Sequence, residues 1–177
     1  MIGFLYPEIC NQQGDLGYKD WLVSSGIETV DLGDLPVSGI TGVVIGDVSQ
    51  RGSEILANKL ENHWLSDAVR EGITVLAIGN SGRIIAKLLG VKSFLGEHKS
   101  EFVETEFAGR ELYGFVNGAF DSDHLIIEEA IGEGRLIQCA LLGPVCVVNP
   151  WFENYCFGIA TSERSDLTEH YKKLASD

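Results

Sequence analysis

The sequence predicts an α/β fold in which helices flank a doubly wound, mostly parallel β-sheet. Short apolar runs alternate along the first half of the chain with segments whose apolar residues recur at helical spacing. Several of these runs are apolar throughout, which is typical of strands that helices cover on both faces. The second half contains stretches of alternating polar and apolar residues, so we expect some antiparallel strands there.

Each expected element of the first half is bounded by a turn signal. We expect strands at residues 2–6, 28–32, 43–46 and 74–78. We expect helices at residues 15–25, 53–71 and 83–89, each followed by a glycine of the kind that ends helices, namely Gly26, Gly72 and Gly90.

The second half changes rhythm after Gly90. Residues 101–107 alternate strictly and predict a half-exposed antiparallel strand, which residues 111–116 and 124–127 are expected to continue. A buried apolar run follows at residues 135–142, and a last helix is expected over residues 165–174. Because no linker divides the chain, residues 1–177 are expected to form one domain.

The charge balance limits the classes of partner. The 177 residues include 13 basic and 26 acidic side chains, a formal net charge of −13, and such a surface repels phosphate backbones. We therefore expect no nucleic-acid partner. No apolar run approaches the roughly 20 residues that span a bilayer, and the first residues lack the basic flank of a secretory signal. These features predict a cytoplasmic protein without a membrane partner.

The cysteines and histidines do not form metal-binding motifs. The four cysteines lack a C-x-x-C pair, so we expect no metal and no cofactor, and we expect the thiols to be small core residues. They are Cys10, Cys139, Cys146 and Cys156. The four histidines are expected on the surface, at His63, His98, His124 and His170.

Two turns come directly after predicted buried strands, at residues 46–50 and 79–82. Ligands bind at the carboxyl ends of the strands in open parallel sheets, so these turns are candidate site segments. The strand, sharp turn and helix over residues 74–89 have the shape of a nucleophile elbow. An ordinary turn between a strand and a helix, in which Asn and Gly are common, is the alternative.

The motifs in these turns resemble class I glutamine amidotransferase domains of the cobyric acid synthase type. The likeness is greatest to the glutaminase subunit of lipid II isoglutaminyl synthase. It rests on Gly-Asp-Val-Ser-Gln at residues 46–50, on the elbow at residues 76–83, and on Leu-Leu-Gly-Pro, four residues and Asn-Pro at residues 141–150. Tyr-Gly-Phe-Val-Asn at residues 113–117 adds to it. The resemblance implies a flavodoxin-like sheet.

The same resemblance implies that catalysis is lost. In that family a Cys thiolate attacks the glutamine amide, and a His activates the thiol. The Cys position falls on Asn80, or on Gly79 if the turn is aligned one residue earlier, and the His position falls on Leu142. None of these side chains serves as nucleophile or base, so glutamine hydrolysis is not expected. A rearranged nucleophile, Ser81 or Cys146, is the alternative.

A pocket for a small amide or amine is expected to persist, or else to be vestigial. Its candidate residues are Gly46, Asp47, Gln50, Gly79, Asn80, Ser81, Gly82, Asn117 and Gly143. The resemblance implies a partner as well, namely a Mur-ligase-like or other amidating synthetase, of the peptidoglycan-precursor or cobyric acid type. We therefore expect a binding or regulatory subunit. A hydrolase with a rearranged nucleophile, or a sensor of a glutamine-like ligand, is the alternative.

Four aromatic residues after Asn149 and Pro150 have two interpretations. They could form the interface with such a partner, or they could pack into the core, and core packing is favoured. They are Trp151, Phe152, Tyr155 and Phe157.

Overall fold

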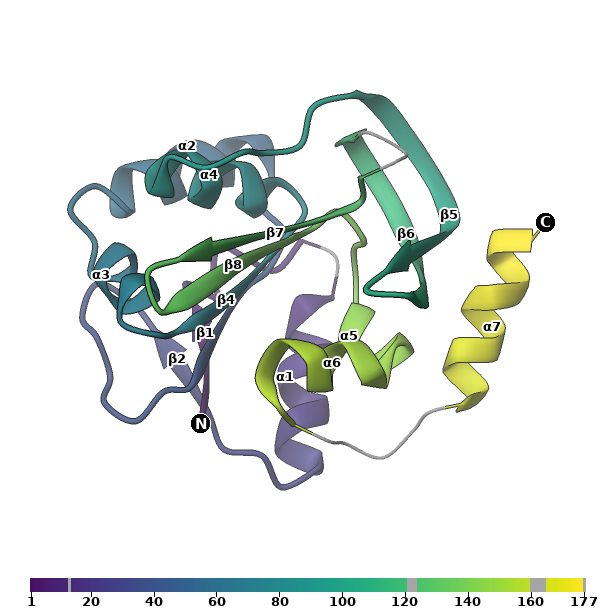
Figure 1. Ribbon diagram of the computed structural model, residues 1–177, viewed down its shortest axis with the longest axis horizontal. Coiled ribbons are helices and arrows are strands. Elements are labelled where there is room, and N and C mark those ends of the chain that lie inside the picture. Colours follow the sequence, from purple (N-terminus) through teal and green to yellow (C-terminus); the bar gives the residue numbers. More distant parts are fainter. Residues whose placement is uncertain (13, 121–123, 160–164, 177) are drawn as a thin grey trace.

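Helices lie on both sides of a central β-sheet in the computed structural model, which describes residues 1–12, 14–120, 124–159 and 165–176 (Figure 1). The sheet has the strand order β2-β1-β3-β4-β8-β7. Its strands are β1 (Ile2–Leu5), β2 (Thr29–Leu32), β3 (Gly42–Ile45), β4 (Thr74–Ile78), β7 (Ile126–Ile131) and β8 (Gly134–Cys139). All neighbours pair in parallel except β7, which is antiparallel to β8.

Two apolar layers cover the two faces of the sheet. One contains side chains from α1 (Asp15–Ser24), α5 (Val145–Val148) and α6 (Pro150–Phe157). The other contains side chains from α2 (Gln50–Lys59), α3 (Leu65–Arg70) and α4 (Asn80–Leu89). Neighbouring residues of one strand therefore enter different layers, as Val44 and Val43 do. This explains why the central strands are apolar at every position, and the doubly wound fold is confirmed.

The expected helix over residues 53–71 is wrong in its continuity, because the chain forms α2 and α3 with a break between them. Asn62 adopts a left-handed conformation at φ 59°, and the His63 ring accepts the backbone N–H of Leu65 through Nδ1. Leu56, Leu60 and Leu65 are all buried on the same side of the sheet. The apolar pattern therefore continues across the break and conceals it.

The antiparallel part is also divided differently from the prediction. A long hairpin of β5 (Glu97–Phe107) and β6 (Arg110–Phe120) forms a separate two-stranded sheet. Residues 126–131 do not continue it; they turn at Gly132 and pair with β8 at the edge of the main sheet. Local alternation predicts such strands but not their partners, because strand pairing depends on residues distant in sequence.

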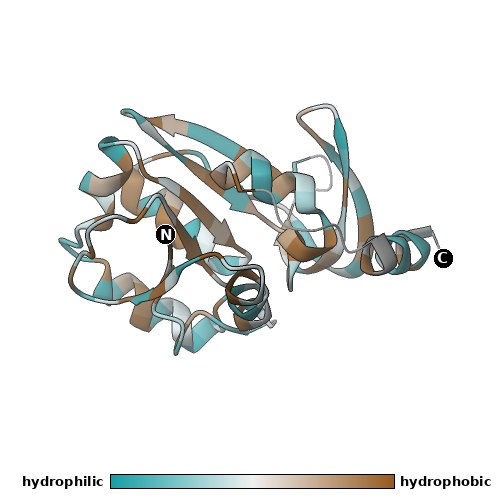
Figure 2. Cartoon of the chain, turned by 90° about the horizontal axis from the view of Figure 1, so that it is seen from below, coloured by the Kyte–Doolittle hydropathy of each residue, from teal (hydrophilic) through white to brown (hydrophobic). Residues whose placement is uncertain are grey.

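The last helix, α7 (Ser165–Ser176), lies against the β5–β6 hairpin (Figure 1). Its Tyr171 ring contacts the Phe102 ring of β5, with centroids 5.6 Å apart. The strands of the main sheet are largely hydrophobic in Figure 2, whereas α7 is largely hydrophilic. In the described part of the chain, every helix is too short or too polar to cross a membrane.

Candidate functional site

The turn between β4 and α4 has the geometry of an elbow centred on Gly79. Gly79 has φ 61° and ψ −132°, a conformation that side chains strongly disfavour. Its N–H donates to the Cys139 carbonyl at 2.8 Å, which fixes the end of β4 against β8. The strained position of the elbow is therefore Gly79, and Asn80 is the first residue of α4.

The space above Gly79 is filled by two side chains. A Cβ at Gly79 would lie 2.3 Å from Asp47 Oδ1 and 2.8 Å from Leu142 Cδ2. Contacts below 3.0 Å do not occur between real atoms of this kind, so even alanine would not fit without movement. Leu142 is itself buried, and its N–H donates to the Phe115 carbonyl at 2.8 Å. The structure thus brings the predicted Leu142 and Gly79 positions together.

Asp47 takes the place in front of the first turn of α4. Its Oδ1 accepts the backbone N–H of Asn80 at 2.8 Å, and its side chain is almost fully buried. The N-terminus of a helix attracts negative charge, yet burial outweighs this and raises the pKa of the Asp47 carboxyl. The carboxylate therefore occupies, from within the chain, the position at which an external anion would approach.

The residues next to the elbow have structural roles in this geometry. Asn80 donates from Nδ2 to the Val48 carbonyl at 3.2 Å. Ser81 is fully buried, and its Oγ lies 3.1 Å from the Ile45 carbonyl and 2.8 Å from the Ile78 carbonyl. Gly82 lies over Gln138 of β8, where an added Cβ would be in ordinary van der Waals contact at 3.4 Å. These contacts hold α4 on the sheet and expose no nucleophile.

The remaining candidates do not share one open pocket. Gly46 is packed against the chain, since a Cβ there would lie 2.3 Å from the Cys10 carbonyl oxygen. Gln50 is exposed at the start of α2, and Asn117 is exposed on β6 opposite Ser100. Gly143 follows Leu142 in the buried loop before α5. Among the candidates, the residues at the ends of β3 and β4 meet at the elbow together with Leu142.

Asp15 is a buried neighbour of this site that the sequence analysis did not select. Its Oδ2 accepts the backbone N–H of Asp47 at 3.0 Å, and it lies against Gly46. The segment containing Asp15 is expected as a helix and, with Asn11 and Gly14, is weakly similar to an Asn…Gly-Asp segment of the resembled family, but an acidic residue in a first helical turn is ordinary. Nothing in its spacing indicates that it would reach the end of β3.

The thiols are buried, as expected, and are poor nucleophiles. Burial raises the pKa of Cys139 and that of Cys10 to about 12, and raises that of Cys146 well above its usual value. In the described ranges, no group of three or more His, Cys, Asp or Glu residues is arranged to hold a metal ion.

One histidine contradicts the prediction of surface positions. His63 is buried between Tyr6 and Trp64, and its Nε2 lies 3.0 Å from the Gly33 carbonyl. Because Nδ1 accepts the Leu65 N–H, Nε2 carries the proton, and burial lowers the pKa of the ring. His98, His124 and His170 are exposed, as expected.

All four aromatic residues of α6 pack against the core, as the favoured interpretation expects, but only Phe152 is fully buried. Phe152 is fully buried, and the Phe107 ring packs against both Phe152 and Tyr155. Trp151, Tyr155 and Phe157 are half-buried against the same layer.

The raised pKa of Asp47 predicts a distinctive pH dependence for Asp47→Asn. A raised folded-state pKa stabilises the protein below the unfolded pKa, and this contribution is lost as the pH rises through the folded pKa. The amide cannot ionise, so the stability of Asp47→Asn relative to the native chain should increase from pH 4 to pH 8. Urea denaturation at several pH values measures it.

Asp34 supplies a control of opposite sign. Hydrogen bonds from Tyr6 and Lys59 lower the pKa of this carboxyl, so its contribution is lost as the pH falls. Asp34→Asn should therefore become relatively less stable from pH 4 to pH 8. If the stability difference between Asp47→Asn and the native chain does not change with pH, or changes in the same direction as for Asp34→Asn, Asp47 is not a buried ionisable group.

Comparison with protein-family models and with curated proteins finds no match. Solved structures do match. A glutamine amidotransferase from Thermotoga maritima superposes with a TM-score of 0.50 at 13% identity, covering 99% of this chain and 88% of that chain. PurLQS from Thermotoga maritima superposes with a TM-score of 0.55 at 12% identity, covering 85% of this chain and 90% of that chain.

A third similar structure is Gan42B, a GH42 β-galactosidase from G. stearothermophilus, with a TM-score of 0.52 at 13% identity. It is covered over 30% of its length, and this chain over 92%. Proteins of different chemistry therefore share this arrangement, and at such identities the likeness concerns the fold alone. The chain has a glutamine amidotransferase-like α/β fold.

Proposed function

We propose that this protein is a glutamine amidotransferase-like subunit that does not hydrolyse glutamine and that binds or regulates an amidating synthetase. The observation that carries the proposal is the filled elbow. Gly79 stands at the strained position, and Asp47 and Leu142 occupy the space in which a nucleophile and its substrate would meet. We infer that Gly79, rather than Asn80, corresponds to the catalytic Cys of the resembled family.

The contact between Gly79 and Leu142 supports this correspondence. A nucleophile and its base must lie within hydrogen-bond reach of each other. The resemblance aligned Leu142 with the His from distant motifs, and its Cδ2 lies 2.8 Å from where a Gly79 Cβ would be. Both positions of the proposed former dyad therefore meet at one point, and neither carries a reactive group.

The alternatives receive less support from the geometry. Ser81 is fully buried and its hydroxyl is engaged with two backbone carbonyls, so it is not available to attack an amide. Cys146 is buried with a raised pKa, which disfavours the thiolate. A sensor of glutamine-like ligands would need room at the elbow, and Asp47 takes that room.

The catalytic half of the proposal is tested by ammonia release from glutamine. We expect no release above the buffer background over a range of protein concentrations, with an active glutaminase assayed in parallel. Release that increases with protein concentration and is abolished in Ser81→Ala or Cys146→Ala would overturn it. The inactive result has a physical reason, since losing nucleophile and base together lowers rates by several orders of magnitude.

The partner half is tested with a Mur-ligase-like synthetase from the same organism. We expect the two proteins to elute together in size-exclusion chromatography and the chain to change the rate of ammonia-dependent amidation by the synthetase. Separate elution together with an unchanged rate would remove the regulatory role. The result is independent of the glutaminase assay, so each half can fail separately.

A further inference from the structure

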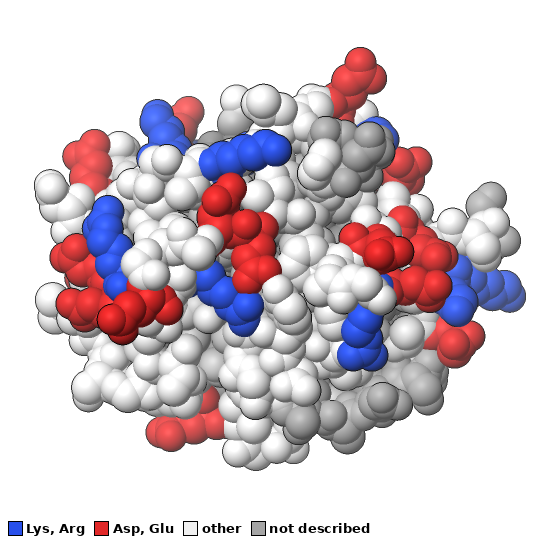
Figure 3. All heavy atoms as spheres, viewed as in Figure 1, with Lys and Arg blue, Asp and Glu red and all other residues white. Residues whose placement is uncertain are grey.

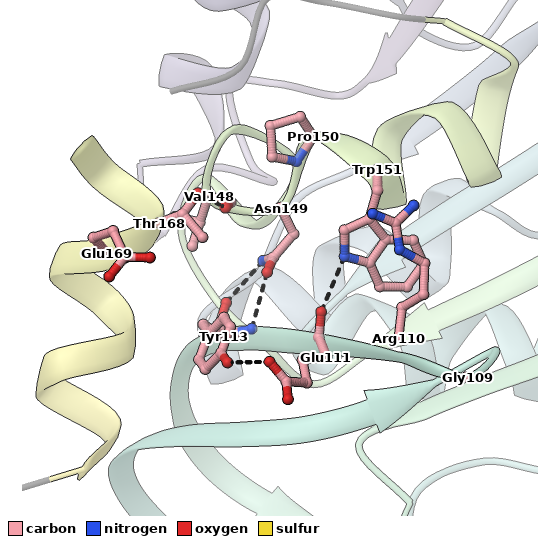
Figure 4. A pocket seen from close by; sticks show the side chains of 10 residues that line it. All are labelled: Gly109, Arg110, Glu111, Tyr113, Val148, Asn149, Pro150, Trp151, Thr168 and Glu169. Atoms are coloured by element: carbon pink, nitrogen blue, oxygen red, sulfur yellow. Dashed lines mark hydrogen bonds between the residues drawn. The ribbon is translucent and has the colours of Figure 1, made fainter. Parts of the chain in front are cut away.

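A cavity far from the elbow lies between the end of the β5–β6 hairpin, the start of α6 and α7 (Figure 4). Its volume is about 460 Å³, enough for an amino-acid side chain and its neighbours. Glu111 and Tyr113 reach it from β6, Trp151 from α6, and Glu169 from α7. Three segments distant in sequence therefore build one site.

Hydrogen bonds hold the two aromatic walls in place. The Trp151 indole N–H donates to the Glu111 carbonyl at 3.0 Å. The Tyr113 hydroxyl donates to Glu111 Oε2 at 2.5 Å, and Asn149 bonds both backbone groups of Tyr113. The rings are thus oriented before any ligand arrives, which reduces the entropy lost on binding.

Carboxylates slightly outnumber cationic side chains around the cavity, three against the two of Arg110 and Lys172. Desolvation, followed by the nearby carboxylates of Glu111, Glu104 and Glu169, raises the pKa of the Tyr113 phenol. Among the described residues, none of these three carboxylates forms an ion pair with Lys or Arg within 4.0 Å. Figure 3 shows acidic side chains gathered over the end of the hairpin, with basic side chains beside them toward α7. The cavity therefore attracts a cation more strongly than an anion.

Two cations of the chain already lie over the aromatic rings. The Arg110 guanidinium is 4.7 Å from the centroid of Trp151, and Lys172 Nζ is 5.6 Å from that of Tyr113. Glu111 is exposed, and within the described part of the chain its Oε2 accepts a hydrogen bond while its Oε1 has no donor. Room for one more charge-assisted bond remains beside the rings.

We propose that this cavity binds a guanidinium or primary ammonium group between Glu111, Glu169 and the Tyr113 and Trp151 rings. Carboxylates bind such groups through charge-assisted hydrogen bonds, and aromatic faces add cation–π attraction. The group belongs either to an Arg or Lys side chain of another protein or to a free small amine. The site does not depend on the proposed function, because it is separate from the elbow.

The test uses three probes and isothermal titration calorimetry at low salt. N-acetylarginine methylamide represents an arginine within a protein, agmatine represents a free small cation, and N-acetylcitrulline methylamide is the neutral isostere of the first. We expect saturable binding of a guanidinium probe, at least tenfold weaker binding of the citrulline probe, and weakening of the guanidinium probe by salt.

Variants locate the binding. Glu169→Gln should weaken the guanidinium probe at least tenfold, whereas Glu101→Gln, exposed on β5 of the same hairpin, should not change it. Glu169 is exposed, so an unchanged melting temperature shows that the fold is intact. Stronger binding of the blocked arginine indicates a protein side chain, and equal or stronger binding of agmatine indicates a free cation.

Three results would overturn the site. They are no saturable binding of either guanidinium probe, equal binding of the citrulline probe, and binding that Glu169→Gln leaves unchanged.

Discussion

Replacing Gly79 by alanine is expected to lower the free energy of unfolding by about 4 kcal/mol. Two effects add: a side chain at φ 61° and ψ −132° carries about 1–3 kcal/mol of backbone strain, and overpacking a filled site costs about 1–3 kcal/mol more. The overpacking arises because the new Cβ would lie 2.3 Å from Asp47 Oδ1. Urea denaturation with fluorescence detection measures the change.

Gly90 at the end of the same helix is the matched control. It also has a positive φ, 70°, but an added Cβ would meet no atom within 4 Å. Gly90→Ala should therefore cost only about 1 kcal/mol, from backbone conformation alone. In an Asp47→Ala background, the destabilisation caused by Gly79→Ala should fall to about 2 kcal/mol, because the main steric contact of the new Cβ is gone. Equal costs at Gly79 and Gly90 would show that the elbow has free space.

This prediction bears directly on function. If the elbow is filled, placing Cys at position 79 and His at position 142 will not by itself create a glutaminase, because Asp47 still occupies the space. A large coupling between positions 47 and 79 would support a site that has been closed by internal packing. No coupling would reopen the possibility of a ligand at the elbow.

Replacing Asn149 by aspartate should destabilise the protein by about 4 kcal/mol at neutral pH. Asn149 is buried, accepts the Tyr113 N–H at 2.9 Å and donates to the Tyr113 and Val145 carbonyls, each at 2.8 Å. A carboxylate cannot donate, so it would face two carbonyl oxygens and remain charged in the interior. An uncompensated buried charge of this kind typically costs about 3–5 kcal/mol of folding stability.

The pH dependence of the stability loss distinguishes the burial of a charged carboxylate from a change in packing. The introduced carboxyl will have a raised folded-state pKa, so its penalty should shrink as the pH falls and the protonated group donates again. Asn117→Asp, at an exposed position of the same strand β6, should change stability by less than about 0.5 kcal/mol. A penalty at position 149 that does not depend on pH would contradict the assigned hydrogen bonds.

The expected result for Asn149 would also change the role assigned to the motif at residues 141–150. In the sequence that motif is evidence of a family resemblance. In the structure its Asn joins α5 to β6, and its Leu142 forms a bridge with Phe115 of the same strand. The motif therefore makes packing contacts in this chain, and these contacts do not require a His at position 142.

Periodicity predicted most of the elements, because burial on a sheet or helix face is recorded locally. The strands near residues 2–5, 74–78 and 134–139 match the predicted runs closely. Periodicity failed where the structure depends on contacts between residues that are distant in sequence. Leu60 and Leu65 both pack on the sheet, so the break between α2 and α3 left no trace in the pattern. Similarly, the strand expected at residues 124–127 gave no sign that residues 126–131 pair with β8 instead of continuing the hairpin.

The candidate site likewise has features that the local sequence predicts and features that only tertiary contacts decide. The sequence alone predicted the fold class, and it shows that neither Cys nor His stands at the two positions that the family resemblance aligns with a catalytic pair, because residue identity and short spacing carry that information. The tertiary structure decided that Gly79 is the strained residue of the elbow, that Asp47 and Leu142 fill the space above it, and that Asp15 supports Asp47. Those contacts join segments more than 30 residues apart, and only folding at the ends of parallel strands brings them together.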